Sequence, residues 1–281
     1  MQSSSGAPRP CSKNSEPRPG ARIALGIEYD GAAFHGFQRQ ANAPSVQEAL
    51  ETALSTVAAQ PVRVTAAGRT DAGVHATGQV VSLTAPSRWA PERLRRALNA
   101  VLPRDIWVAS AAAANADFHA RYDARARGYV YRVGTSPLAR SPFLWRRCWP
   151  LCEALDRDAL DAAAARLQGE HSFRAFARSG QPHRGDRCVV HLAEWREWQP
   201  AGLRFRVVAN RFLHHMVRYL VGTMVDVARG RRGTDEVAGL LEGVAGLGTS
   251  PPAPPGGLYL TDVYYEGDSW TGEDVINEVL S

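Results

Sequence analysis

The chain has 281 residues, of which 44% are hydrophobic and 22% charged, the balance of an ordinary globular protein. No apolar run approaches the roughly 18 residues of a membrane-spanning helix, and the first residues lack the apolar core of a signal peptide. We therefore expect a soluble, cytoplasmic protein with one large domain or two ordinary ones. Lys13 is the only lysine among 33 basic residues and the net charge is +5, which fits either a phosphate-rich partner or solvated arginine faces.

The first half of the chain predicts the order β-α-β-β-α-β. Residues 1–20 are rich in Ser, Pro and Gly, and we expect a disordered tail. Alternating apolar residues predict a strand over 23–29, and the capping-box pair Ser45 and Glu48 opens an amphipathic helix. The remaining elements are strands at 62–67 and 77–84, a helix that begins at Pro91, and a strand at 105–112.

The second half repeats this order more loosely. It predicts strands at 128–133, 188–198, 203–209 and 258–266, with helices at 156–167 and 210–229. The fold class is therefore α+β, with two similar split βαβ halves of the RRM or ferredoxin type. Each half is expected to be an antiparallel sheet with helices on one face. The predicted domains are 21–120 and 121–268, followed by a tail at 269–281.

A polar loop between the second and third strands carries the densest chemical signal. It reads Gly68-Arg69-Thr70-Asp71-Ala72-Gly73-Val74-His75. Its glycines allow a tight turn and a close approach to a ligand, and Arg69 can help to keep Asp71 ionised. The alternative is that Asp71 only caps backbone N–H groups of the turn.

Three further side chains have two interpretations each. Arg218 lies in a mostly apolar helix pattern, where it either pairs with an acid or phosphate or extends to solvent. Tyr129 and Tyr131 share one face of their strand, where they either pack in the core or stack on a base.

Seven arginines lie in the stretch from Arg121 to Arg147, and they offer a track for nucleic-acid phosphates. Cys148 and Cys152 could form half of a metal site, but no second Cys or His pair completes it, so we predict no metal.

Several motifs in a fixed order resemble the tRNA pseudouridine synthase A family. The resemblance covers about residues 23–265, and the loop from Gly68 to His75 is its most specific part. The matching motifs are Tyr29-Asp30-Gly31, Gly36-Phe37-Gln38-Arg39-Gln40, Ser45-Val46-Gln47, Gly68 to His75, Phe118-His119-Ala120-Arg121, Tyr129, Phe212-Leu213-His214-His215-Met216-Val217-Arg218 and Gly257-Leu258-Tyr259-Leu260.

The resemblance implies a role for particular residues. Asp71 falls on the catalytic aspartate, Arg218 on the arginine that pairs with it, and Tyr129 on the tyrosine that stacks on the base. Arg69 falls on the arginine that assists extrusion of the base. Gly73, His75 and Arg121 are then expected at the substrate-binding site, in a cleft between the two halves.

The resemblance also implies a substrate and an assembly. Members of the family act as homodimers on uridines 38, 39 and 40 of the tRNA anticodon stem-loop. The isomerisation involves no redox change and no phosphoryl transfer, so we expect no cofactor. Asp71 can add covalently to the nucleoside or start an elimination at the ribose, and the sequence leaves both routes open.

Two competing functions are weaker. A non-catalytic RNA-binding protein with two RRM-like halves would carry aromatic RNP-type motifs, and the strand at 62–67 has none. A hydrolase of glycosidic bonds generally needs a second carboxylate, and the loop from Gly68 to His75 offers only Asp71.

Overall fold

The computed structural model describes residues 20–86, 88–178 and 185–266 of the chain. The N-terminal half contains β1 (Ala21–Tyr29), α1 (Val46–Ala58), β2 (Val64–Ala66), β3 (His75–Ala85), α2 (Pro91–Asn99) and β4 (Ile106–Ala113). The C-terminal half contains β5 (Ala126–Gly134), β6 (Trp149–Pro150), α3 (Arg157–Ala165), β7 (Gly169–Ser172), β8 (Arg187–Trp198), β9 (Gly202–Ala209), α4 (Met216–Ala228), α5 (Asp235–Glu242) and β10 (Leu258–Tyr264).

Both halves have the same strand order. The N-terminal strands lie as β4-β1-β3, and β2 pairs with β3. The C-terminal strands lie as β10-β5-β9-β8. If each half is numbered by itself and the short strands β6 and β7 are left out, both run fourth, first, third, second, which is the order of a split βαβ unit. The predicted α+β class and its internal repeat are therefore confirmed.

The two halves share one ten-stranded sheet because β10 pairs with β3. This pairing is parallel and short, with Tyr259 opposite His75 and Leu260 opposite Ala76. β2 pairs with the same edge of β3 farther along, at Val81 to Leu83. The last strand of the chain thus joins the C-terminal half to the N-terminal half.

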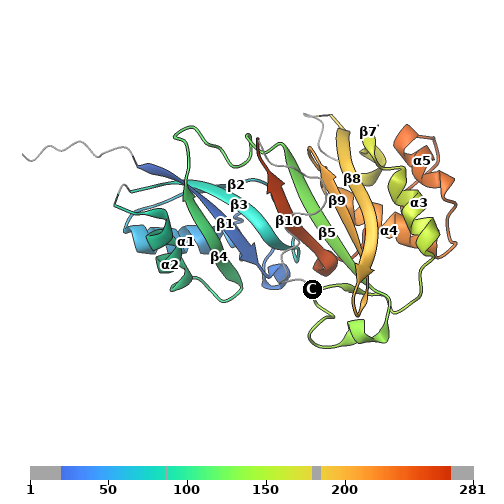
Figure 1. Ribbon diagram of the computed structural model, residues 1–281, viewed down its shortest axis with the longest axis horizontal. Helices are drawn as coiled ribbons and strands as arrows, with labels where there is room; N and C mark the ends of the chain where they lie inside the picture. The colour runs from blue at the N-terminus through green and yellow to red at the C-terminus, as the bar shows by residue number, and fades with distance from the viewer. Residues whose placement is uncertain (1–19, 87, 179–184, 267–281) are drawn as a thin grey trace, which may run out of the picture.

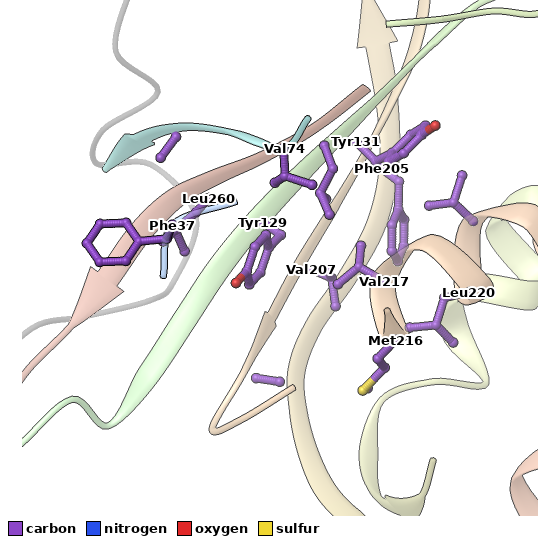
Figure 2. Close-up of a cluster of buried hydrophobic side chains, with 14 of the residues drawn as sticks. Phe37, Val74, Tyr129, Tyr131, Phe205, Val207, Met216, Val217, Leu220 and Leu260 are labelled. Atoms are coloured by element: carbon purple, nitrogen blue, oxygen red, sulfur yellow. The ribbon is translucent and has the colours of Figure 1, made fainter. Parts of the chain in front are cut away.

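Amphipathic helices cover the sheet of each half. Figure 1 shows α1 and α2 beside the N-terminal strands, and α3, α4 and α5 grouped at the other end of the molecule. In α1, Val46, Leu50 and Leu54 are buried, as their helical spacing predicts. Figure 2 shows Phe205 and Val207 of β9 beside Val217 of α4. The predicted helix starts at Ser45 and Pro91 are also confirmed, and the Ser45 side chain accepts a hydrogen bond from the Glu48 N–H.

Several predicted bounds are wrong. The long helix predicted over 210–229 begins only at Met216, because His215 has a left-handed backbone with a φ of 64°. The strand predicted over 62–67 is reduced to β2. α5 and the short strands β6 and β7 were not predicted, since each is too short to give a clear period.

Two predictions concern parts of the chain that the structure does not describe or cannot test. Apart from Gly20, both predicted tails lie outside the described residues, and the predicted domain limits remain predictions. No helix in the described ranges is long and apolar enough to span a membrane.

The joint between β3 and β10 gives the first testable prediction. A Cβ on Gly78 of β3 would collide with the backbone carbonyl of Thr261 in β10. We expect Gly78→Ala to lower the free energy of unfolding by about 1–3 kcal/mol, the usual cost of overpacking. Gly248→Ala is the matched control, since its Cβ meets open space, and should change stability by less than about 1 kcal/mol. Urea denaturation of the two variants measures the difference, and equal stabilities would show that the joint tolerates a side chain.

Candidate active site

Asp71 begins a tight turn between β2 and β3. The N–H of Val74 donates to the carbonyl of Asp71 at 3.2 Å, and Gly73 has a φ of +75°. A positive φ at the third of four residues is the geometry of a type II turn, which favours glycine. Gly73 therefore sets the shape of the turn that presents Asp71.

Neighbouring loops of the N-terminal half hold this turn. The Phe37 N–H donates to the Thr70 carbonyl at 3.1 Å, and the Gly73 N–H donates to the Phe34 carbonyl at 3.2 Å. The hydroxyl groups of Tyr29 and Thr70 share a buried hydrogen bond of 2.8 Å. Burial raises the pKa of Tyr29 to about 12, so this hydroxyl stays neutral. The backbone on both sides of Asp71 is thereby fixed.

Gln79 of β3 supports the start of the loop and was not singled out by its sequence pattern. Its side chain is fully buried. Its Nε2 donates to the Gly68 carbonyl at 2.8 Å, and its Oε1 accepts from the Gly68 N–H at 3.4 Å. A buried amide satisfied on both sides by one residue positions that residue closely. Only the unusual placement of a glutamine inside an apolar strand signalled this role.

Three nitrogen-bearing side chains from the C-terminal half face the Asp71 carboxylate. Nε2 of His214 lies 3.4 Å from Oδ1, and Nε2 of His215 lies 3.3 Å from Oδ2. Nη1 of Arg218 lies 3.8 Å from the same Oδ2. The carboxylate is about one-quarter exposed, so these groups replace much of its water. The structure therefore brings Asp71 and Arg218 together, as the resemblance implies.

His214 and His215 are partners of Asp71 that the sequence pattern did not identify. Both histidines fall within the helix predicted over 210–229, but they precede the observed helix, which begins at Met216. Arg211 donates to the carbonyl of Gly185 at 3.2 Å. The contact of His214 and His215 with a loop far away in the sequence depends on tertiary structure, which no local period encodes.

A loop at residues 253–257 holds both sides of the site. Its carbonyl groups accept hydrogen bonds from Nε of Arg218 and from the hydroxyl of Tyr131, each at 2.7 Å. A third carbonyl lies 3.2 Å from Nε2 of His75. A Cβ added to Gly73 would lie 3.1 Å from a proline of this loop. Arg218 is therefore held from outside its own helix, and it does not extend to solvent.

Tyr129 and Tyr131 of β5 are both buried, and Tyr129 lies close to Asp71. Figure 2 shows Tyr129 between Leu260 and Val207 of the adjacent strands. Its ring packs edge-on against Phe212, with centroids 4.9 Å apart. Burial first, and then the charges of Tyr29 and Asp71, raise the pKa of Tyr129 well above its usual value. Its hydroxyl is neutral, and Tyr131 is completely buried.

The other predicted site residues differ in exposure. Arg69 is exposed, and among the described residues its guanidinium makes no hydrogen bond or ion pair. Arg121 is exposed as well, 5.9 Å above the Tyr122 ring. His75 is buried, and its ring stacks on Tyr259 at 4.8 Å. Arg69 and Arg121 are thus open to a ligand, whereas His75 points into the interior.

Nδ1 of His75 has two neighbours at the same distance. It lies 3.1 Å from the Gly31 backbone nitrogen and 3.1 Å from Oδ1 of Asp30. Without a proton, Nδ1 accepts from the Gly31 N–H, whereas an Nδ1 that carries a proton donates to Asp30. The His75 contact is the main cause that lowers the pKa of Asp30. In either state His75 fixes the chain just after β1.

The arginine-rich stretch from Arg121 to Arg147 is only partly available for RNA. Arg127 donates to backbone carbonyls, among them that of Ala67 at 2.8 Å. Arg132 is buried and lies over the rings of Trp198 and Tyr259. The interpretation of all seven arginines as a phosphate track is therefore wrong for these two. The exposed members are Arg121, Arg125, Arg140, Arg146 and Arg147.

The site also contains ligand types that metals prefer. Ligand atoms of Asp71, His214 and His215 all lie within 4.8 Å of one another. Imidazole and carboxylate together suit Zn²⁺. The guanidinium of Arg218 beside the carboxylate opposes a second positive charge. The prediction of no metal did not foresee this group, because it forms only on folding.

Comparison with known proteins identifies the family. A family model described as tRNA pseudouridine synthase matches residues 26–123 and 163–266. The chain belongs to the tRNA pseudouridine synthase family. A tRNA pseudouridine synthase A of Burkholderia multivorans is 45% identical over 249 residues, covering 88% of this chain and 91% of that protein.

Two other relatives show the same extent of similarity. A tRNA pseudouridine synthase A of Cereibacter sphaeroides is 44% identical over 254 residues, covering 88% of this chain and 97% of the relative. One from Rhodopseudomonas palustris is 42% identical over 249 residues, covering 87% and 99%. The similarity to members of the tRNA pseudouridine synthase family thus extends over almost their whole length.

The positive charge of Arg218 should weaken metal binding by Asp71, His214 and His215. We expect Arg218→Ala to raise the affinity for Zn²⁺ by roughly tenfold or more, because a positive charge beside Asp71 is removed. Competition with a chromogenic chelator measures the affinity. Arg211→Ala is the control, since Arg211 contacts Gly185 instead of Asp71. Unchanged Zn²⁺ affinity in Arg218→Ala would show that Arg218 does not govern this group.

Proposed function

We propose that this protein isomerises uridine to pseudouridine in tRNA, with Asp71 as the catalytic nucleophile. The observation that carries the proposal is the half-buried Asp71 carboxylate between the two halves, contacted by His214, His215 and Arg218. Membership in the tRNA pseudouridine synthase family supports the same reaction and substrate class.

The chemistry requires an ionised carboxylate. The base must leave the ribose at N1, rotate and rejoin it through C5, without oxidation or phosphoryl transfer. A carboxylate that adds to the nucleoside or removes a ribose proton can start this sequence, and no cofactor is needed. Arg218 supplies the opposite charge that favours the ionised form of Asp71 in a partly desolvated position.

The proposed substrate is the anticodon stem-loop, at uridines 38, 39 and 40. A base within a stem must leave the helix before it can react. In this proposal the exposed guanidinium of Arg69 enters the vacated position, and the ring of Tyr129 is the surface on which the extruded base stacks. Gly73 and His75 shape the loops around Asp71, and Arg121 binds phosphate from the surface.

The resemblance to the family supports two further proposals, on location and on assembly. We assign the protein to the cytoplasm, where tRNA is modified, and to a homodimer. Analytical ultracentrifugation of the purified protein tests the assembly. A monomer at micromolar concentration would contradict the homodimer without affecting the proposed chemistry.

The alternative, a non-catalytic RNA-binding protein, explains the exposed arginines but leaves Asp71 without a purpose. Binding of phosphates needs positive charge alone. A carboxylate in the middle of a basic site weakens such binding by repulsion. A carboxylate held in that place is therefore better explained by catalysis.

Asp71→Asn separates the two functions. The substitution keeps the size of the side chain but removes its charge and its reactive oxygen. We expect pseudouridine formation to fall at least about a thousandfold, the scale seen when a catalytic nucleophile is removed. Affinity for tRNA should persist, because the arginines that contact phosphate are unchanged. The assay is nucleotide-resolved mapping of pseudouridine in unmodified tRNA, in buffer with excess EDTA, beside a binding titration.

Three outcomes would contradict the proposal. If the wild-type protein makes no pseudouridine, the proposed function is wrong. If an Asp71→Asn variant reacts at the wild-type rate, the function stands but Asp71 is not the catalytic residue. Restoration of activity by one added metal would overturn the cofactor-free reaction.

Tyr129 gives a second test of the same function. Tyr129→Phe keeps the aromatic face and removes a neutral hydroxyl, so we expect most activity to remain. Tyr129→Leu removes the stacking surface, which is worth about 1–3 kcal/mol per base, and should lower the single-turnover rate about tenfold or more. An equal, severe loss in both variants would instead assign proton transfer to the hydroxyl.

A further inference from the structure

His215 occupies a strained position at the start of α4. Its φ of 64° lies in the left-handed region. For a residue that has a β-carbon, this backbone conformation costs about 1–2 kcal/mol of conformational energy. It is the N-cap residue of α4, yet its side chain makes no capping hydrogen bond. Residues such as Ser or Asp at this position usually stabilise a helix by about 1 kcal/mol. His215 therefore has neither an unstrained backbone nor a capping hydrogen bond. Backbone strain of this kind often occurs where a residue makes a functional contact.

The contact that His215 makes instead is with Asp71. Its Nε2 lies 3.3 Å from Oδ2, the oxygen that Arg218 also faces. The side chains of His215 and Arg218 are 16% and 13% exposed, so both approach from the protein side. The other oxygen, Oδ1, faces His214, whose side chain is 39% exposed. The two oxygens of one carboxylate therefore have different environments.

His215 can donate a hydrogen bond to Asp71 while its ring is neutral. Burial lowers the pKa of His215, and His214, Arg218 and Arg178 act in the same direction, whereas Asp71 acts against it. The ring is therefore neutral at pH 7 and carries one N–H. With the proton on Nε2 it donates to Asp71 and adds no charge, so the positive charge beside Oδ2 comes from Arg218.

We propose that His215 is a positioning residue that holds Oδ2 of Asp71 together with Arg218, and so turns Oδ1 toward the uridine. The inference rests on the proposed function. His214, the exposed partner of Oδ1, gives up its contact when the nucleoside arrives. The present 3.3 Å separation shortens in the complex, as contacts of catalytic groups commonly do when substrate binds.

Two substitutions of His215 separate the effect of the N–H group near Asp71 from the effect of backbone strain. His215→Asn tolerates the left-handed backbone but is too short to place an N–H at the position of Nε2. His215→Gln places an amide N–H near that position. We expect the single-turnover rate to fall about tenfold or more in the Asn variant, with tRNA affinity within about threefold of wild type. The Gln variant should recover most of the rate, and melting temperatures should show that both are folded.

His214→Asn is the matched control for the assignment of the oxygens. It removes the neighbouring ring, which contacts Oδ1, and should lower the rate less than His215→Asn. If His214→Asn is the more damaging of the two, Oδ1 is not the oxygen left open and the proposal fails. If the Asn variant of His215 fails to fold, His215→Gly, which also suits the backbone and lacks the donor, takes its place.

The remaining outcomes are also decisive. A wild-type rate in folded His215→Asn would remove the positioning role, even though the protein makes pseudouridine. Equal, low rates in the Asn and Gln variants would show that an N–H at this place is insufficient, which also overturns the proposal. Absence of pseudouridine in the wild-type reaction would overturn the proposed function instead, so the two failures are distinguishable.

Discussion

A carboxylate withdrawn from water needs positive charge beside it, and here that charge comes from the opposite half of the chain. Asp71 belongs to the N-terminal half, and Arg218 belongs to the first turn of a helix in the C-terminal half. Neither half alone contains both members of the pair. The site therefore exists only when the two similar halves are joined in a fixed relation, and much of the fold serves that relation.

The fixed relation depends on β10. This strand completes the C-terminal sheet and pairs in parallel with β3, which follows directly after the Asp71 turn. The core continues across this joint, since Val74, Tyr129 and Leu260 belong to one buried cluster. A shift of one sheet against the other would displace Asp71 from its three partners. Continuous packing resists such a shift, because buried side chains interlock.

Local sequence patterns predicted secondary-structure elements but not the tertiary contacts between them. The period of apolar residues and the Ser45 capping signal predicted most helices and strands of both halves, since these depend on neighbours in the sequence. The resemblance to a family supplied the pairing of Asp71 with Arg218, which the residues alone left open. The contacts of His214 and His215 escaped prediction, because one left-handed residue moves them out of the helix. The buried role of Arg132 is equally non-local, since its aromatic partners lie on other strands.

The loop at residues 253–257 connects parts that a mutational survey would treat as separate. It binds Arg218, Tyr131 and His75, and it packs against the turn at Gly73. A change in this loop therefore moves the carboxylate and its counter-charge together, and effects of paired substitutions here should be non-additive. An exchange of this segment between relatives would succeed only if the residues that it touches in both halves were exchanged with it.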